Sequence, residues 1–261
     1  GKIRLGKFGE WSESECTVYK CNRCLAGFLP QENFSYETDE YRLRVEGDAS
    51  IEHFRRAHDR EQAEKLGIAG TDGWRDKIVA DIGCGGGSFL DFLSGVARET
   101  VAIEPCDSYR PGLTQRHKYF QGCSEALGEY AGKVDVAVSF AVIEHTGDPL
   151  QFLREIKQLI KPGGYLLLST PNYDDWLIDF LAGSYDRFFY RAAHTWYFNG
   201  ESLKQLAALA GFKQVSVRYK QRFDLSNALH WIRDHRPTGL GKTRKFHDLD
   251  GVYQQHLEGA G

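Results

Sequence analysis

A glycine-rich segment and a carboxylate further along the chain carry the residue types that could hold a small ligand. Asp81, Gly83, Gly85 and Gly87 lie within one short segment, and Glu104 follows about 20 residues later. Glycines allow a sharp turn and let bare backbone N–H groups approach a ligand closely. A carboxylate at the position of Glu104 can accept hydrogen bonds from the two hydroxyls of a ribose. The spacing therefore predicts a site for a ligand that contains a nucleoside.

The same segment departs from the dinucleotide fingerprint G-x-G-x-x-G. Ser88 occupies the position of the third glycine of that fingerprint. Asp81 adds a negative charge beside the turn, where a pyrophosphate would need a positive one. We therefore expect a ribose but no pyrophosphate here, and a nicotinamide-dependent oxidoreductase is the least favoured class of enzyme.

Alternating strands and helices must position these residues. Ile78–Ile82 is an apolar run typical of a strand buried on both faces. Ser88–Leu93 then has the spacing of a helix that turns apolar side chains inward, namely Phe89, Phe92 and Leu93. Further strands are expected at 100–104, 119–121, 134–140, 165–169 and 212–219, and further helices after Asp148 and Asn199. This alternation predicts an α/β fold in which a parallel sheet lies between two layers of helices.

Four successive motifs resemble those of class I S-adenosylmethionine-dependent methyltransferases. The motifs are Asp81–Gly87, Ile103–Pro105, Ser139–His145 and Leu159–Tyr165. The resemblance covers about residues 75–220 and is nearest to the branch that includes ubiquinone-pathway O-methyltransferases and bacterial sugar and natural-product methyltransferases. It implies a Rossmann-like three-layer sandwich with a mostly parallel seven-stranded sheet, whose last strand is antiparallel. No run typical of that last strand follows Tyr219.

The resemblance also implies that S-adenosyl-L-methionine is the cofactor, and it assigns contacts by position. Asp81, Gly83, Gly85 and Gly87 would line its methionine and ribose, and Glu104 would hold the ribose hydroxyls. Pro105 would lie beside the adenine, and Ser124 would face the adenine amino group in a loop where the usual acidic residue is displaced. Phe140 and Ala141 would border the cofactor and the reacting methyl group.

Methyl transfer from a sulfonium is an in-line displacement, so the protein mainly has to align the reactants and exclude water. A hydroxyl or activated carbon nucleophile must also lose a proton. His145, after the fourth strand, is the first candidate for the base, and His194 is the second. The alternative for His145 is a structural role, in which it and Glu144 fix the loop that shapes the cofactor pocket.

An insert at 173–198 separates the fifth strand from the helix that follows Asn199, and it carries ten aromatic residues. Loops at the carboxyl ends of such strands line the ligand crevice. The insert is therefore predicted to be a lid or a substrate wall, with Trp176 and Tyr197 in contact with the substrate. A small satellite core and a self-association surface are the alternatives.

Three further segments flank the domain at 75–220. Residues 1–35 hold Cys16, Cys21 and Cys24, which resemble half of a zinc-ribbon module. A structural zinc site needs four ligands, so a hairpin with free thiols is expected and no metal ligand is predicted; zinc completed by a His or by other residues is the alternative. Residues 36–74 are expected to form a helical cap or linker, with a helix from Ala49 to Leu66 that Gly67 ends. Its basic side chains face solvent or an anionic ligand: Arg55, Arg56, His58 and Arg60. Residues 221–261 are expected to form a C-terminal extension with a locally basic stretch that faces solvent or contacts a phosphate: Arg233, His235, Arg236, Lys242, Arg244 and Lys245.

The composition narrows the class further. A formal net charge of −3 argues against nucleic-acid binding, and no apolar run approaches the length of a membrane helix. The six cysteines do not form the pattern of a secreted disulfide framework, so a cytoplasmic location is expected. We predict an enzyme that methylates oxygen or carbon of a small molecule such as a sugar or quinone-like ring, as a monomer or a homodimer. An RNA methyltransferase and a non-catalytic S-adenosylmethionine-binding regulatory protein are the alternatives.

Overall fold

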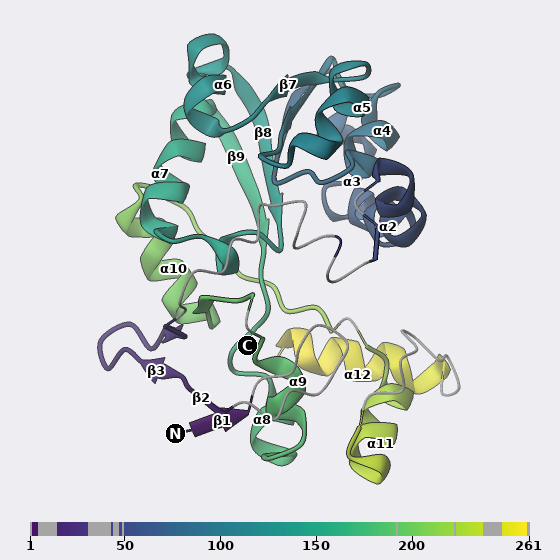
Figure 1. The fold of residues 1–261 in the computed structure, drawn as a ribbon, viewed down its shortest axis with the longest axis vertical. Coiled ribbons are helices and arrows are strands. Elements are labelled where there is room, and N and C mark those ends of the chain that lie inside the picture. Colours follow the sequence, from purple (N-terminus) through teal and green to yellow (C-terminus); the bar gives the residue numbers. More distant parts are fainter. Residues whose placement is uncertain are drawn as a thin grey trace. The chain divides into compact units, whose positions relative to one another are not determined.

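The computed structural model describes residues 2–4, 15–30, 43, 47–48, 50–191, 193–221, 223–236 and 247–259. The chain forms two compact units (Figure 1). The sheet unit comprises Ser35–Thr170 and Leu209–Phe212, and the aromatic unit comprises Gly1–Phe34, Pro171–Ala208 and Lys213–Gly261. Three basic residues of the predicted C-terminal stretch lie outside the described residues: Lys242, Arg244 and Lys245.

The sheet unit is built on five parallel strands in the order β7-β6-β5-β8-β9. Their bounds are β5 Ile78–Ile82, β6 Glu99–Ile103, β7 Lys118–Phe120, β8 Val134–Phe140 and β9 Ile160–Ser169. Strand order reverses between β5 and β8, because the chain adds strands on one side of β5 and then on the other. Ligands of open α/β sheets bind outside the carboxyl ends of the strands at such a switch point. The predicted glycine turn follows β5 and therefore lies there.

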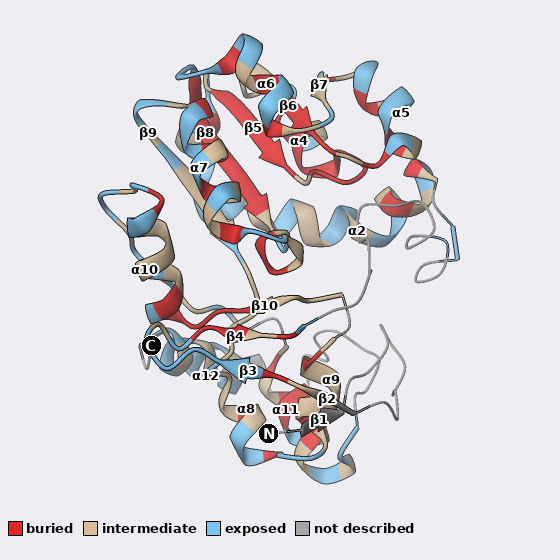
Figure 2. Cartoon of the chain, turned by 60° about the vertical axis from the view of Figure 1, so that its left-hand side comes forward, coloured by how far each residue is buried: buried red, intermediate tan, exposed pale blue. Residues whose placement is uncertain are grey.

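Apolar side chains on the two faces of the sheet form separate cores. The central strands are accordingly coloured as buried in Figure 2. Val79 of β5 packs on one face, while Ile78 and Ala80 pack on the other. Helices α4 Ser88–Leu93 and α5 Arg110–Thr114 contribute to the first core, and α6 Cys123–Tyr130 and α7 Pro149–Leu159 contribute to the second. The three-layer α/β fold is thus confirmed.

The helical segment before the sheet is longer than predicted. Helix α2 Ile51–Lys65 begins after Ser50, whose hydroxyl accepts a hydrogen bond from the His53 N–H. Gly67 does not end this segment: a 3₁₀ turn at Leu66–Ile68 and helix α3 Gly70–Trp74 follow directly. In α4 the inward position predicted for Phe92 was wrong, because Leu90 is buried and Phe92 is 41% exposed.

The strand predicted at 212–219 was wrong, and the sheet has five strands where seven were expected. The expected last strand is also not found among the described residues after Tyr219, which are 220–221, 223–236 and 247–259. The Tyr219 carbonyl instead accepts a hydrogen bond from the Gln254 side chain in α12 His247–Gly259. The side chains of Val217 and Tyr219 pack against Gly200 at the start of α10 Gly200–Leu209. These contacts hold the segment in the aromatic unit and take the place of pairing with β9.

The aromatic unit contains two small cores of its own. Its described elements are β1 Lys2–Arg4, β2 Glu15–Thr17, β3 Tyr19–Lys20, β4 Gly27–Phe28, α8 Trp176–Phe180, α9 Tyr185–Phe189, β10 Trp196–Tyr197, α10, α11 Leu225–Asp234 and α12. Tyr190 and Tyr197 of the insert pack with Val18 and Leu29, and Tyr185 packs with Trp231 of α11. The aromatic side chains of the insert therefore form satellite cores within this unit, and the insert's role as a lid or substrate wall stays a prediction.

The predicted hairpin in the N-terminal segment is present. Strands β3 and β4 pair antiparallel, and β10 of the insert pairs with β4. Cys21 and Cys24 lie in the turn of this hairpin as free cysteines.

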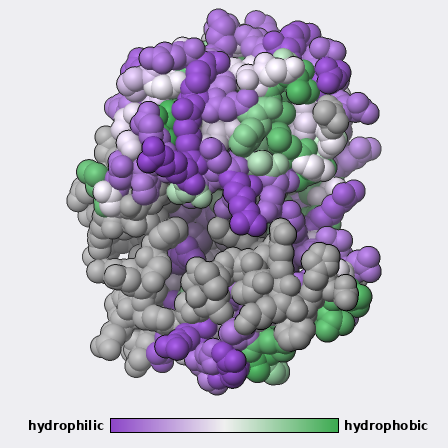
Figure 3. All heavy atoms as spheres, turned by 90° about the vertical axis from the view of Figure 1, so that its right-hand side faces the viewer, coloured by the Kyte–Doolittle hydropathy of each residue, from purple (hydrophilic) through white to green (hydrophobic). Residues whose placement is uncertain are grey.

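The surface of the described residues is largely polar on the face shown in Figure 3, with smaller apolar patches. Such patches are ordinary on a folded protein. Among the described helices, none is long and apolar enough to cross a membrane.

Candidate functional site

The glycine turn after β5 has a backbone that other residues adopt only with strain. Gly83, Gly85 and Gly87 have φ angles of +77°, +54° and +81°. A Cβ on Gly83 would lie 2.5 Å from Val142, and one on Gly85 would collide with the ring of Phe54 from α2. Side chains of the protein itself therefore occupy the space beside these glycines and leave no room for a Cβ.

Glu104 joins the end of β6 to this turn. Its carboxylate accepts a hydrogen bond of 2.7 Å from the Gly85 N–H and one of 3.0 Å from the Cys106 N–H. The side chain is buried, so its negative charge is held in place beside the turn. An ionised carboxylate only accepts hydrogen bonds, which suits the two hydroxyl donors of a ribose.

Asp81 supplies a second buried carboxyl group at the same edge. Its pKa is raised to about 7, mainly by burial; the nearby Lys65 opposes this rise and Glu104 adds to it. The ammonium of Lys65, at the end of α2, lies 4.7 Å from the centre of the Phe140 ring. The sequence does not predict Lys65 at this edge, because only the packing of α2 brings it to the end of β8.

The end of β8 completes the edge. Ser139 donates a hydrogen bond of 3.0 Å to the Ile82 carbonyl, and the Ala141 N–H donates one of 2.9 Å to Ser169 of β9. Ala141 has a φ of +57°, an uncommon value for a residue with a side chain. Phe140 and Ala141 therefore lie beside the glycine turn, as the order of the strands requires.

Glu144 follows in a 3₁₀ turn at Ile143–His145 and is 1% exposed. Thr170 donates a hydrogen bond of 2.9 Å to Glu144 Oε2, and among the described residues Oε1 has no hydrogen-bond partner. Burial raises the pKa of Glu144 to about 7, against the opposing effect of its own N–H and of Thr170. A carboxylate oxygen of Glu144 lies within 4.8 Å of a ring nitrogen of His145. The site thus holds a carboxyl group and an imidazole side by side.

Comparison with known proteins identifies the family. Residues 53–217 match the family model described as "Methyltransferase domain". The chain belongs to this methyltransferase family. One relative is a protein of Mycobacterium tuberculosis (strain CDC 1551 / Oshkosh) named "Probable S-adenosylmethionine-dependent methyltransferase". The two are 31% identical over 142 residues, and this stretch covers 53% of this chain and 50% of that protein. This chain is also 33% identical over 102 residues to the ubiquinone biosynthesis O-methyltransferase of Ruegeria pomeroyi. That stretch covers 36% of this chain and 41% of the relative.

The chain thus spans about half the length, or less, of these curated relatives. A solved S-adenosylmethionine-dependent methyltransferase from Archaeoglobus fulgidus has the same fold, with a TM-score of 0.53 and 17% identity over 84% of this chain and 90% of that one. The resemblance inferred from the four motifs is confirmed, and S-adenosylmethionine is the cofactor of the family.

The carboxyl ends of β5, β6 and β8, here called the cofactor edge, fit this cofactor chemically. S-adenosylmethionine carries two cationic groups and a ribose diol, and the edge offers two buried carboxyl groups, Asp81 and Glu104. Pro105 follows Glu104 and is half-buried. Ser124 is exposed in the first turn of α6, beyond the edge strand β7, and is the least central of the predicted contacts.

The remaining predicted residues lie in the aromatic unit. Tyr197 is buried, and its hydroxyl donates to the Arg191 carbonyl and accepts from the Arg191 N–H. The Trp176 indole N–H donates to the Tyr253 hydroxyl at 3.2 Å. His194 is partly buried in the same unit. The roles of these three residues toward a substrate stay predictions.

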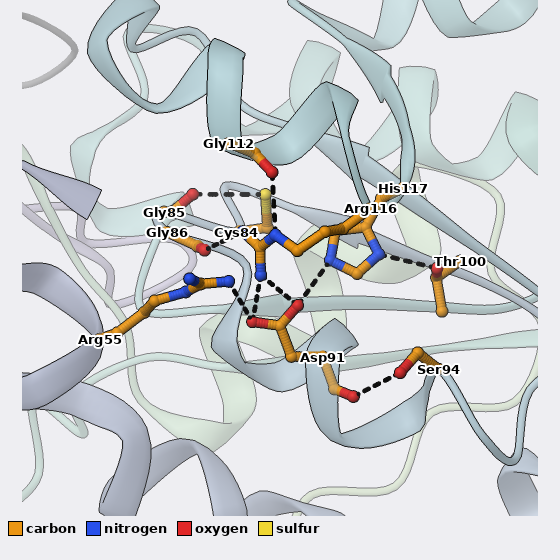
Figure 4. Close-up of polar contacts among 10 residues, drawn as sticks. All are labelled: Arg55, Cys84, Gly85, Gly86, Asp91, Ser94, Thr100, Gly112, Arg116 and His117. Atoms are coloured by element: carbon orange, nitrogen blue, oxygen red, sulfur yellow. Dashed lines mark hydrogen bonds and ion pairs between the residues drawn. The ribbon is translucent and has the colours of Figure 1, made fainter. Parts of the chain in front are cut away.

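A polar cluster around Asp91 of α4 was not expected from the sequence (Figure 4). Arg55 of α2 and Arg116 both pair with its carboxylate, and His117 lies 3.0 Å from it. The expectation that Arg55 faces solvent or an anionic ligand was wrong, because Asp91 is its partner. Local spacing does not reveal this pair, whose members lie on two different helices.

Proposed function

We propose that this protein transfers the methyl group of S-adenosylmethionine to a hydroxyl oxygen, or to an activated carbon, of a small molecule. The meeting of Asp81, the glycine turn and Glu104 at one sheet edge is the observation that carries this proposal. The ubiquinone biosynthesis relative supports an oxygen acceptor on a quinone-like ring, and a sugar hydroxyl is of the same chemical class.

The cofactor, when bound, supplies a methyl group on a sulfonium that is already a good leaving group. Glu104 would hold the ribose hydroxyls, and its two backbone hydrogen bonds keep its carboxylate from turning away. Asp81 would face the methionine ammonium, and Phe140 would border the methyl group. These residues align the reactants, and alignment can lower the barrier of such a displacement by roughly several kcal/mol.

In this proposal His145 accepts the proton of the acceptor, and Glu144 assists it. A neutral hydroxyl is a poor nucleophile, so a base beside it speeds the reaction, typically by 10²- to 10⁴-fold. The buried carboxylate of Glu144 would stabilise the imidazolium that His145 becomes when it accepts the proton. His194 is the alternative base, and Trp176 and Tyr197 are the proposed substrate contacts.

Transfer of a labelled methyl group tests the proposal. The protein is incubated with methyl-labelled S-adenosylmethionine and pools of catechols, phenols and sugars, with Glu104→Ala as the control. Labelled product from the wild type alone supports the function. Cofactor binding without product in any pool contradicts it and favours the non-catalytic alternative.

A second variant tests the base. His145→Ala should lower turnover on any acceptor so found by at least about 100-fold while cofactor affinity changes little. An equal loss of turnover and affinity would instead assign His145 the structural role.

A further inference from the structure

The cluster around Asp91 joins three parts of the sheet unit, namely α2, α4 and the segment just before β7 (Figure 4). Arg55 Nη2 from α2 donates to Asp91 Oδ2 at 2.7 Å, and Arg116 Nη1 pairs with both carboxylate oxygens. His117, just before β7, places Nε2 3.0 Å from Asp91 Oδ1. Asp91 itself lies on the helix that follows the glycine turn. One carboxylate is therefore shared by two guanidinium groups and an imidazole.

Arg116 carries this cluster to the glycine turn. Its Nη2 donates to the Gly86 carbonyl at 3.2 Å, and its Nε donates to the Gly112 carbonyl at 2.8 Å. On the other side of the turn, the neighbouring Gly85 N–H donates to Glu104. The turn is thus held from two sides, by an arginine at its carbonyl and a glutamate at its N–H.

His117 fixes the other side of the carboxylate. Its side chain is fully buried, with Nδ1 2.8 Å from the Thr100 hydroxyl. An ionised carboxylate can only accept hydrogen bonds, so Nε2 must carry the hydrogen toward Asp91. A neutral ring then accepts from Thr100 at Nδ1. This arrangement leaves Asp91 little freedom to follow Arg116 if that side chain moves.

Removal of the negative charge would leave Arg55 and Arg116 beside each other without their shared partner. The two guanidinium groups would repel each other, and Arg116 would withdraw from the Gly86 carbonyl. The Phe54 ring, one residue from Arg55, packs against both Gly85 and Gly86 and would follow any shift of α2. Loss of the Asp91 charge therefore disturbs the turn at two points.

We propose that Asp91 is a positioning residue for the cofactor, which acts through Arg116 on the Gly86 carbonyl. The inference rests on cofactor binding at the glycine turn but not on the identity of the methyl acceptor. Calorimetric binding of S-adenosylmethionine therefore tests it without an acceptor, so a failed search for the acceptor leaves the result intact.

Three variants separate positioning from simple stability. Asp91→Asn removes the charge, and Arg116→Lys keeps a charge but loses the fork that reaches Gly86. Each should weaken cofactor binding by about tenfold, the effect of one hydrogen bond that involves a charged group. Asp91→Glu keeps the carboxylate and should recover most of the lost affinity.

Asp135 offers a matched control at the amino edge of the same sheet. Its buried carboxylate accepts from the Ile78 N–H and pairs with Lys161 and Arg98. Asp135→Asn should lower the unfolding temperature at least as much as Asp91→Asn but leave the dissociation constant unchanged. The proposal is overturned if Asp91→Asn and Arg116→Lys bind the cofactor as tightly as the wild type. It is also overturned if Asp135→Asn weakens binding to the same extent.

Discussion

Replacement of Glu144 by glutamine should change how the stability of this protein depends on pH. Burial raises the pKa of Glu144 from its ordinary 4.5 to about 7, so the folded protein holds a proton that the unfolded chain has already released between these values. The folded state is then disfavoured as pH rises through this window. Below pH 4.5 both states are protonated and there is no penalty, and above pH 7 the penalty is complete.

The size of the effect follows from the two pKa values. Each tenfold difference in proton affinity corresponds to about 1.4 kcal/mol, so the full penalty is about 3 kcal/mol. Glutamine cannot ionise. The free energy of unfolding of Glu144→Gln minus that of the wild type should therefore increase by about 3 kcal/mol between pH 4.5 and pH 8. Any cost of an unpaired amide N–H at this position is independent of pH and shifts the whole difference curve without changing its slope.

Urea unfolding at several pH values between 4.5 and 8 measures this difference. Asp135→Asn is the control, because Lys161 and the Ile78 N–H outweigh burial and hold the pKa of Asp135 below its usual range. Its difference curve should be flat above pH 5, since that carboxylate is ionised in both states there. A flat curve for Glu144→Gln as well would refute the assignment of a buried carboxyl group with a raised pKa.

Three further changes test the cofactor edge. Gly85→Ala should destabilise the protein by at least about 1–2 kcal/mol in urea unfolding, and Phe54→Leu in the same chain should restore only the part due to the collision, since the positive φ remains. Glu104→Gln should weaken S-adenosylmethionine binding in calorimetry by at least tenfold, because the amide brings an N–H donor to a position that receives backbone N–H groups; unchanged affinity would contradict the ribose contact. Cofactor affinity should rise with pH as Asp81 ionises around its pKa of about 7, and Asp81→Asn should abolish this rise.

The cofactor edge could be predicted from the sequence because its signals are local. A buried strand, a glycine turn and a helix follow one another directly in 78–93, and each has its own pattern of residues. Glu104 could be placed beside the turn because parallel strands end at the same edge of a sheet. The structure confirms this proximity through the hydrogen bond between Glu104 and Gly85.

The strand predicted at 212–219 shows where local patterns fail. Alternating apolar residues indicate that a segment can pair as a strand, but they do not say whether a sheet edge is available to it. Here Val217 and Tyr219 pack against Gly200, and the Tyr219 carbonyl is taken by Gln254. Tertiary contacts thus decide the structure of a segment whose sequence alone favours a strand.

The reason for glycine at position 85 shows a subtler limit. The sequence shows that the position requires glycine but not which atoms exclude a side chain. Phe54 occupies that place, and its neighbour Arg55 is bound to Asp91 on the helix after the turn. Helix α2 is therefore attached to the glycine turn by an apolar contact and by an ion pair at adjacent residues. We therefore expect a change in either contact to disturb the other, and the affinity for the cofactor to depend on a helix that carries none of the predicted cofactor contacts.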